Sequence, residues 1–384
     1  MNYDKIKILR ISKDEIILKK SLGIYIHIPF CVRKCKYCDF LSGPAEVDVQ
    51  KKYTQMLLEE IARYQELLEN SHIKTVFFGG GTPSILEGKE IVKILDKLKV
   101  YGDLAEDAEI SIEANPGTVT EEKLLLWKKA GINRISFGLQ SAHNEELKRL
   151  GRIHTWEAFE ENYRLARNCG FTNINVDLMS ALPGQTVDNW KNTMEKVADL
   201  DPEHISAYSL IIEEGTPFFD VYGEHPELLP TEEEEREMYY ETKSFLARKG
   251  YERYEISNYA KSGYECKHNL SYWERKDYLG LGLGAASLLG NVRKSNQTDL
   301  KEYLKGNFDG ENENLTEEDS MEEYFFLGLR MMRGVDWTPY RKQYEKTVDK
   351  LVKKGLLEKE GNHIRLTELG IDVSNYVLAE FLME

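Results

Sequence analysis

The chain has 384 residues, enough for one large domain and a smaller one. Its hydrophobic content of 41% and charged content of 30% are typical of a soluble globular protein. The net charge of −15 disfavours a nucleic-acid backbone or an anionic membrane surface as the main partner. No apolar run approaches the roughly 18 residues needed to span a bilayer, and the N-terminus lacks a cleavable signal pattern. We therefore expect no membrane span and a cytoplasmic location.

Residues 5–20 alternate apolar and polar side chains, which predicts a strand or hairpin. A repeated strand-then-helix pattern follows. The strand-like runs are 24–28, 75–78, 109–113, 134–137, 174–178 and 204–210. The helix-like segments between them are 46–69, 87–99, 121–129, 155–168 and 187–199. This alternation predicts an α/β fold of parallel strands with crossover helices, and both an open doubly wound sheet and a barrel fit it.

Cysteines at spacings of four and three follow the first strand-like run: Cys31, Cys35 and Cys38. Three thiolates on one loop can hold three corners of a [4Fe–4S] cube and leave the fourth iron open to a chelating small molecule. The alternatives are a zinc site, which usually needs a fourth protein ligand, and a disulfide, which a cytosolic chain disfavours. The remaining cysteines, Cys169 and Cys266, are predicted to be buried structural thiols.

Polar and glycine residues follow each later strand-like run, where the carboxyl ends of parallel strands gather ligands. The glycines at 79–81 offer exposed backbone N–H groups. Glu113 and Asp177 are carboxylates at strand ends, which predicts contacts to ribose hydroxyls or to an ammonium group. Arg152 could pair with a carboxylate of the ligand. In the alternative interpretation, these charged side chains pair with one another.

The second half of the chain starts with an acidic run that predicts a helix over 231–249, with Thr231 as its N-cap. Residues 251–287 are rich in aromatic side chains, and the polar residues 307–316 predict a linker between a core domain, 1–306, and a C-terminal domain, 317–384. Helical patterns at 317–333, 338–354 and 368–382 and a hairpin over 356–367 resemble a winged-helix domain. Acidic residues outnumber basic ones there by 14 to 10, so DNA binding is not expected.

The C-x3-C-x2-C spacing resembles the signature of the radical S-adenosylmethionine superfamily. Its flanks, Tyr25-Ile-His-Ile-Pro-Phe-Cys31 and Tyr37-Cys38-Asp39-Phe40, resemble the coproporphyrinogen oxidase-like branch and, within it, the HemW haem-chaperone group. The resemblance implies a partial (β/α)6 barrel followed by the smaller winged-helix-like domain. It also implies a [4Fe–4S] cluster, S-adenosylmethionine and haem as bound groups.

The same resemblance assigns residues to these groups. The cysteine triplet would hold the cluster. S-adenosylmethionine would contact Tyr25, Gly80, Gly81, Thr82, Glu113, Gln140, Arg152 and Asp177. Haem would contact an H-N-x-x-Y-W motif made of His268, Asn269, Tyr272 and Trp273, with Cys266 as a secondary candidate. Without the resemblance, a histidine beside aromatic rings is more often a hydrogen-bonded core residue.

Departures from the oxidases of this branch favour a chaperone. Those enzymes resemble this chain but place a fourth cysteine where Phe40 stands, and they carry a longer N-terminal segment with a P-R-Y-T-S-Y-P motif. The expected function is therefore to bind haem and transfer it to an acceptor, a haem-requiring respiratory protein. Two alternatives stay open. One is oxidative decarboxylation of coproporphyrinogen III, and the other is radical chemistry on another tetrapyrrole, such as haem ring opening.

Overall fold

A computed structural model describes residues 19–382. The strand or hairpin expected over 5–20 lies almost wholly outside the described residues, since the first strand begins at Lys20. Among residues 19–382, no helix is both long enough and apolar enough to cross a bilayer.

A curved twelve-stranded sheet forms the core, with strand order β12-β11-β10-β9-β1-β2-β3-β4-β5-β6-β8-β7. Strands β1 to β6 are parallel neighbours in chain order, as the strand-then-helix pattern predicts. Their bounds are Lys20–Ile28, Ser71–Gly80, Asp103–Ala114, Arg134–Gln140, Ile174–Ser180 and His204–Ser209. The sheet does not close on itself, because β12 and β7 are its free ends among the described residues. The fold is thus the expected α/β class with a partial (β/α)6 barrel.

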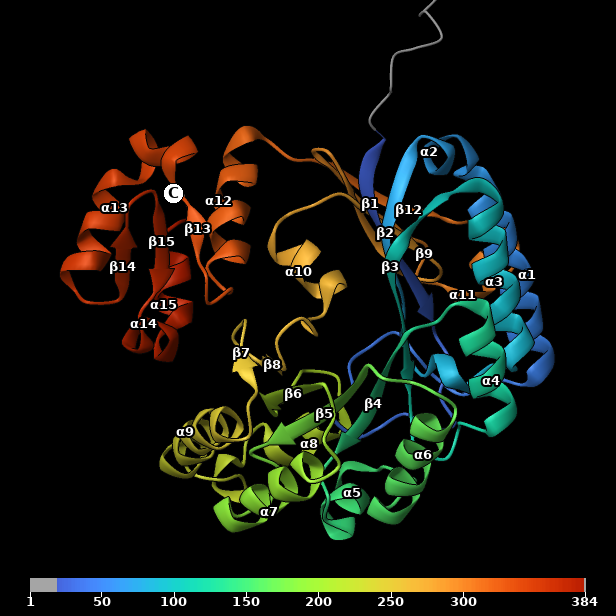
Figure 1. The fold of residues 1–384 in the computed structure, drawn as a ribbon, viewed down its shortest axis with the longest axis horizontal. Coiled ribbons are helices and arrows are strands. Elements are labelled where there is room, and N and C mark those ends of the chain that lie inside the picture. Colours follow the sequence, from blue (N-terminus) through green and yellow to red (C-terminus); the bar gives the residue numbers. More distant parts are fainter. Residues whose placement is uncertain (1–18, 383–384) are drawn as a thin grey trace, which may run out of the picture.

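The crossover helices cover the outer side of this sheet (Figure 1). They are α1 (Val47–Arg63), α2 (Gln65–Glu69), α3 (Gly88–Tyr101), α4 (Glu121–Ala130), α5 (Asn144–Leu150), α6 (Trp156–Asn168) and α7 (Val187–Ala198). In α3, Ile91, Ile94, Leu95 and Leu98 recur at helical spacing and are buried against the sheet. Because helices cover the outer side of the sheet, the polar residues at the strand ends face the inner side and the edge formed by the carboxyl ends of the strands.

Residues after β6 extend the sheet at both ends. Short α8 (Pro217–Tyr222) precedes α9 (Glu232–Arg248), which Thr231 caps as expected through a capping box with Glu234. Strands β7 (Glu252–Arg253) and β8 (Asn258–Ala260) follow, then α10 (Lys267–Trp273). Strand β9 (Tyr278–Leu281) pairs in parallel with β1, and β10 (Ala286–Leu289) and β11 (Val292–Asn296) continue that edge. Helix α11 (Leu300–Tyr303) leads to the last strand.

The polar stretch 307–316 differs from the expected linker. Asp309–Asn314 form β12, which pairs antiparallel with β11. Ion pairs from Arg63 and Lys294 to Asp309 fix its start. A strand can form from so polar a sequence because it lies at the sheet edge, with every side chain exposed. The division of the chain into domains remains a prediction.

The C-terminal unit lies across from the inner side of the sheet (Figure 1). It contains α12 (Glu317–Gly328), α13 (Arg341–Lys353) and a three-stranded sheet of β13 (Val335–Asp336), β15 (His363–Leu366) and β14 (Leu357–Glu360). The helix expected over 368–382 is instead two short helices, α14 (Glu368–Asp372) and α15 (Ser374–Ala379). They separate at Val373, whose φ of −120° and ψ of 35° are not helical. Helices around a small sheet with a hairpin give the expected winged-helix-like arrangement.

Candidate functional site

The cysteine triplet lies on the loop between β1 and α1, and this loop is anchored to several elements. Cys31 N–H donates to the Gly43 carbonyl at 3.0 Å, which closes the loop on itself. Lys36 N–H donates to the Leu150 carbonyl at 3.0 Å, at the end of α5. The Lys36 carbonyl accepts from Phe218 N–H at 3.0 Å, at the start of α8. These backbone bonds close the loop at Cys31 and attach its middle, between Cys35 and Cys38, to α5 and α8.

Hydrogen bonds among side chains of β1 and α1 also support the cysteine loop. His27 Nε2 hydrogen-bonds the Leu41 carbonyl at 2.9 Å, just after the cysteines. The Tyr25 hydroxyl contacts His27 Nδ1 at 3.1 Å, and the Tyr53 hydroxyl donates to the His27 carbonyl at 2.8 Å. His27, to which the sequence assigned no role, thus connects β1 to the far end of the cysteine loop.

One cavity at the carboxyl ends of the strands brings most of the candidate residues together. It is lined by the three cysteines and, among the expected S-adenosylmethionine contacts, by Gly80, Gly81, Thr82, Glu113, Gln140, Arg152 and Asp177. Tyr25 does not line it. Sequence reasoning missed Tyr37, in the flank of the cysteine motif, and Asn115, two residues after Glu113, and it left Tyr208 without a role.

Two of the sulfur atoms face polar donors. Thr82 Oγ1 lies 3.5 Å from Cys31 Sγ, and Arg152 Nη1 lies 3.6 Å from Cys35 Sγ. Asn115 links these donors, since its Nδ2 donates to Thr82 Oγ1 at 2.7 Å and its Oδ1 accepts from Arg152 at 2.6 Å. Hydrogen-bond donors and a positive charge beside sulfur stabilise thiolates and the sulfurs of an iron–sulfur cluster.

The donor set fits a cube better than a single zinc ion. Among residues 19–382, no three His, Cys, Asp or Glu side chains are gathered as ligands of one metal ion. The three thiols line one shared cavity. A [4Fe–4S] cube binds each thiolate through a different iron and needs no fourth protein ligand, whereas a structural zinc ion usually takes four.

The strand-end carboxylates do not pair with Arg152, which bonds to Asn115 and to the Gly138 carbonyl instead. Glu113 accepts from Gly80 N–H at 3.2 Å, and Asp177 accepts from Ser136 at 3.1 Å and Asn175 at 2.7 Å. Burial and the neighbouring Asp177 raise the pKa of Glu113 to about 8, and burial also raises the pKa of Asp177. Arg134 opposes this shift in both acids, but neither carboxylate forms an ion pair among the described residues, which leaves both able to contact a positively charged ligand.

The backbone is shaped around this cavity at two points. Gly80 has φ of +107°, and a Cβ there would lie 2.5 Å from the His27 ring, so only glycine fits. Gln140 has φ of +75° at a register shift between β4 and β5, and its side chain accepts from the Tyr208 hydroxyl at 3.2 Å. A non-glycine residue in the left-handed region is uncommon and often marks a functional position.

A second, mostly apolar cavity of about 470 Å³ lies between the inner side of the sheet and α12. It is lined by Tyr25, Tyr272, Trp273, Tyr278, Ala286, Leu288, Arg293, Glu323, Phe326 and Leu327. We call it the aromatic pocket. Two of the residues expected to contact haem, Tyr272 and Trp273, therefore line a space within the usual volume range of cofactor sites.

His268 lies beside this pocket but not in it. It is 1% exposed, and both ring nitrogens are hydrogen-bonded, Nδ1 to Thr75 at 2.8 Å and Nε2 to the Tyr272 hydroxyl at 2.9 Å. Its ring stacks on those of Phe77 and Tyr25, with distances between ring centroids of 5.1 Å and 6.4 Å. Burial, aided by the charge of Arg134, lowers the pKa of His268 to about 3, so the imidazole is neutral at pH 7. Asn269 is half-buried on the same helix.

Cys266, the secondary haem candidate, is fully buried, with its thiol 3.5 Å from Glu109 Oε1. Burial raises its pKa to about 12, so it is an unreactive thiol, which agrees with the structural assignment from sequence. Cys169, assigned as a buried thiol too, is only partly buried.

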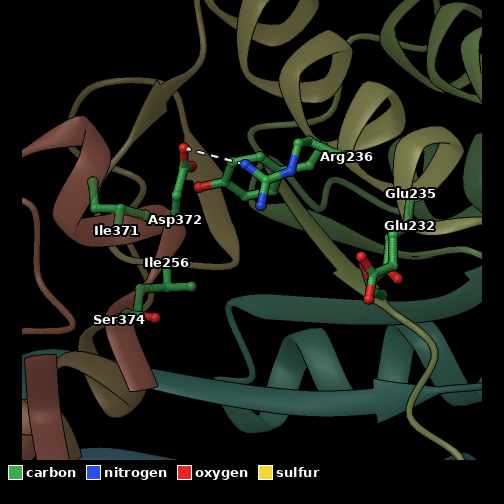
Figure 2. A pocket seen from close by; sticks show the side chains of 9 residues that line it. Glu232, Glu235, Arg236, Ile256, Ile371, Asp372 and Ser374 are labelled. Carbon is green, nitrogen blue, oxygen red and sulfur yellow. Dashed lines mark ion pairs between the residues drawn. The ribbon is translucent and has the colours of Figure 1, made fainter. Parts of the chain in front are cut away.

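A third cleft lies between α9 and the helices that follow β15 (Figure 2). Figure 2 shows Arg236 directed at Asp372, with an ion-pair distance of 3.9 Å, and the carboxylates of Glu232 and Glu235 on the same wall. Acids outnumber bases in this cleft.

Comparison with known proteins defines the class first. Residues 25–197 match the model of the Radical SAM superfamily, and residues 315–373 match the HemN C-terminal domain. The chain is a radical SAM protein, and the cofactors of that superfamily are a [4Fe–4S] cluster and S-adenosylmethionine. The fold agrees, because the structure of coproporphyrinogen III oxidase (HemN) from Escherichia coli, a radical SAM enzyme, is similar with a TM-score of 0.81 and 25% identity, over 94% of this chain and 90% of that one.

Nearly full-length relatives then narrow the family. The chain is 36% identical to heme chaperone HemW of Bacillus subtilis, over 94% of this chain and 99% of that protein. It is 35% identical to heme chaperone HemW of Escherichia coli, over 94% of this chain and 98% of that protein. The chain belongs to the HemW heme chaperone family.

Proposed function

We propose that this protein binds haem and transfers it to an acceptor, a haem-requiring respiratory protein, in the cytoplasm. The observation that carries the proposal is the nearly full-length similarity to proteins named heme chaperone HemW. The aromatic pocket beside His268 supports it independently, since its ring-lined walls suit a flat apolar macrocycle.

Cys31, Cys35 and Cys38 would hold three irons of the cluster, with Thr82 and Arg152 as donors to the sulfurs of the first two. When bound, the cluster and S-adenosylmethionine supply one-electron cleavage of a carbon–sulfur bond. S-adenosylmethionine would be held at the carboxyl ends of the strands. The residues that would contact it there are Gly80, Gly81, Thr82, Glu113, Gln140, Arg152 and Asp177. The carboxylates of Glu113 and Asp177, which form no ion pair among the described residues, favour its positively charged groups. Tyr25 would act from outside the cavity, through its hydrogen bond to His27.

His268 would become a haem ligand by exchanging a hydrogen bond. With the ring proton on Nδ1 and donated to Thr75, Nε2 carries the lone pair that accepts from the Tyr272 hydroxyl. A neutral imidazole is the form that binds iron. Movement of Tyr272 would free Nε2 on the side of the aromatic pocket, where Trp273 would pack on the macrocycle.

Oxidative decarboxylation of coproporphyrinogen III is the second candidate function. The similarity to coproporphyrinogen III oxidase over most of the chain favours it. Phe40 opposes it. This side chain lines the cysteine cavity and is 61% exposed, at the position where the similar oxidases carry a fourth cysteine.

Haem titration under anaerobic conditions, followed by visible absorption, tests the chaperone proposal. The protein should bind one haem, and His268→Ala should weaken binding at least about tenfold while the iron and sulfide content of the cluster is unchanged. His225→Ala is the matched control, because His225 is exposed and remote in sequence from the pocket residues. Undiminished haem binding by His268→Ala would remove this residue from the site, and an absence of haem binding by the unmodified protein would contradict the proposed function.

A further inference from the structure

The aromatic pocket contains a feature that neither the motif nor the family explains. Two charged side chains, Arg293 of β11 and Glu323 of α12, line a cavity that is otherwise formed mainly by rings and aliphatic groups. Arg293 is 39% exposed, but Glu323 is largely buried. A largely buried charge in an apolar cavity is costly unless it is paired, and a charge retained in such a place often serves a ligand.

Glu323 is held by two arginines, one on each carboxylate oxygen. Arg275 Nε donates to Oε2 at 2.8 Å, and Arg293 Nη2 donates to Oε1. Arg275 also donates to Ser320 at 3.0 Å. The side chains of Arg275 and Glu323 are only 14% and 18% exposed, so water screens this pair weakly.

The arrangement is a carboxylate-binding site that a carboxylate of the protein itself occupies. Arg275 follows α10 and Arg293 lies on β11, so the arginines belong to the core, whereas Glu323 belongs to α12 of the C-terminal unit. Planar guanidinium groups bind carboxylates in a directed way. One carboxylate of a ligand in place of that of Glu323 would leave each arginine with an acidic partner, and Arg293 would keep its 3.5 Å ion pair with Glu313.

We propose, on the basis of the proposed haem-binding function, that the propionate groups of haem bind Arg275 and Arg293 and displace Glu323. The macrocycle would then lie against Tyr272, Trp273 and Phe326. Phe326 is 43% exposed on α12, although it lines the pocket, so an apolar ligand there would cover it. The exchange removes one of the contacts that hold α12 to the core, which couples haem loading to release of this helix.

The position of the arginines relative to His268 supports the same occupant. Tyr272 and Tyr25 line the pocket, and both contact the His268 ring, Tyr272 through a 2.9 Å hydrogen bond and Tyr25 by stacking. The pocket thus has a candidate iron ligand behind one wall and carboxylate receptors on another. These are the two kinds of group that a metalloporphyrin with two acid side chains requires.

The cleft in Figure 2 is a poor site for the same ligand. It carries Glu232, Glu235 and Asp372 against one arginine, Arg236, which Asp372 already neutralises. A dicarboxylate would be repelled there. The balance of charge therefore favours the aromatic pocket over this cleft as the site for haem.

Haem and its dimethyl ester, which lacks the propionate charges, are the probes that test this inference. In anaerobic titrations of the full chain, Arg293→Gln should weaken haem binding about tenfold or more and leave binding of the ester within about twofold. Glu323→Gln should tighten haem binding several-fold, because the competing carboxylate is gone while the shape is kept. Lys294→Gln is the matched control, since Lys294 is the next residue on β11 and pairs with Asp309 away from the pocket.

Opposite effects of the arginine and glutamate variants separate ligand binding from a loss of folding, because damage to the fold would weaken binding in both. Equal haem affinities of the unmodified protein, Arg293→Gln and Glu323→Gln would overturn the inference while leaving the chaperone proposal intact. Equal affinity of the unmodified protein for haem and for the ester would overturn it as well. Failure of the unmodified protein to bind haem at all would instead overturn the proposed function and, with it, this inference.

Discussion

Arg152 contacts both the sulfur of Cys35 and the backbone carbonyl of Gly138. It is half-buried, lies 3.6 Å from Cys35 Sγ and bonds to Asn115, which in turn bonds to Thr82 beside Cys31. A single guanidinium thus connects Cys35 to Cys31 through Asn115 and Thr82. Removal of any member of this chain leaves buried polar atoms without partners.

Cys35→Ala should abolish the cluster, because two thiolates leave two irons of the cube without protein ligands. We expect iron and sulfide contents near zero after anaerobic reconstitution and loss of the broad visible absorption. Cys169→Ala should keep the full content, because Cys169 lies outside the cavity-lining residues. A full cluster in the Cys35 variant would contradict the assignment of the three ligands.

Glu113 should make the stability of the cofactor-free protein depend on pH. Its pKa is raised by burial to about 8, so between about pH 5 and 8 the folded protein holds a proton that the unfolded chain releases. The stability that this proton contributes is complete below the unfolded pKa and is lost as the pH rises through 8. The free energy of unfolding should fall about 1.4 kcal/mol per pH unit more steeply than in Glu113→Gln. Denaturant titrations at several pH values measure this difference, and parallel slopes would refute it.

Much of the site was predictable at the residue scale, and the exceptions have physical causes. The cysteines, Glu113 and Asp177 stand at strand ends, where the pattern of the chain alone marks them. The contact of Tyr208 could not be predicted, because it depends on the register between β5 and β6. That register brings the Tyr208 hydroxyl to Gln140 across the sheet. His268 shows the opposite case, because the sequence could not reveal that both ring nitrogens already have partners.

At the scale of elements, one tyrosine of α1 connects β1 to the residues that follow β9. The Tyr53 hydroxyl donates to the His27 carbonyl and accepts from Leu283 N–H, both at 2.8 Å, in a fully buried position. Tyr53→Phe leaves both backbone groups without that partner and should lower the free energy of unfolding by about 1–3 kcal/mol. Tyr240→Phe, which removes an exposed hydroxyl, should change it by less than about 0.5 kcal/mol. Equal effects in chemical denaturation would contradict this role.

Most long elements were predictable and most short ones were not. Strands β1 to β6 and the helices α1, α3, α4, α6 and α7 are apolar and periodic, so sequence reasoning found them, and it also found the short hairpin of β14 and β15. It missed α5, which has seven residues. Strands β7 and β8 have two and three residues, too few for a period to show. Strand β12 is wholly exposed, and pairing with β11 alone makes it a strand. The break between α14 and α15 arises from a backbone turn at Val373 that composition does not signal.

The whole molecule combines two sites that face different parts of the same sheet. The cysteine cavity lies at the carboxyl ends of the strands, and the aromatic pocket lies between the inner side of the sheet and α12. Tyr25 connects them, since it lines the pocket and bonds to His27, which supports the cysteine loop. Haem and the cluster could therefore influence each other without direct contact.

Haem binding should loosen α12 if it displaces Glu323. Backbone amides in α12 should then exchange with deuterium several-fold faster in the haem-bound protein than in the haem-free protein, because a weakly screened ion pair is lost. Amides of α13 report on the rest of the C-terminal unit and should change less. Slower exchange in α12 on haem binding would show that the helix closes on the ligand instead.

The central claim is that this radical SAM protein carries haem without converting a tetrapyrrole. Anaerobic incubation of the reconstituted protein with S-adenosylmethionine and a reductant, in the presence of either haem or coproporphyrinogen III, followed by product analysis, tests it most directly. We predict intact haem bound to the protein and unchanged coproporphyrinogen III. Steady formation of protoporphyrinogen IX would establish an oxidase, and loss of haem with stoichiometric release of 5′-deoxyadenosine would establish a ring-opening enzyme. Either result would contradict the account.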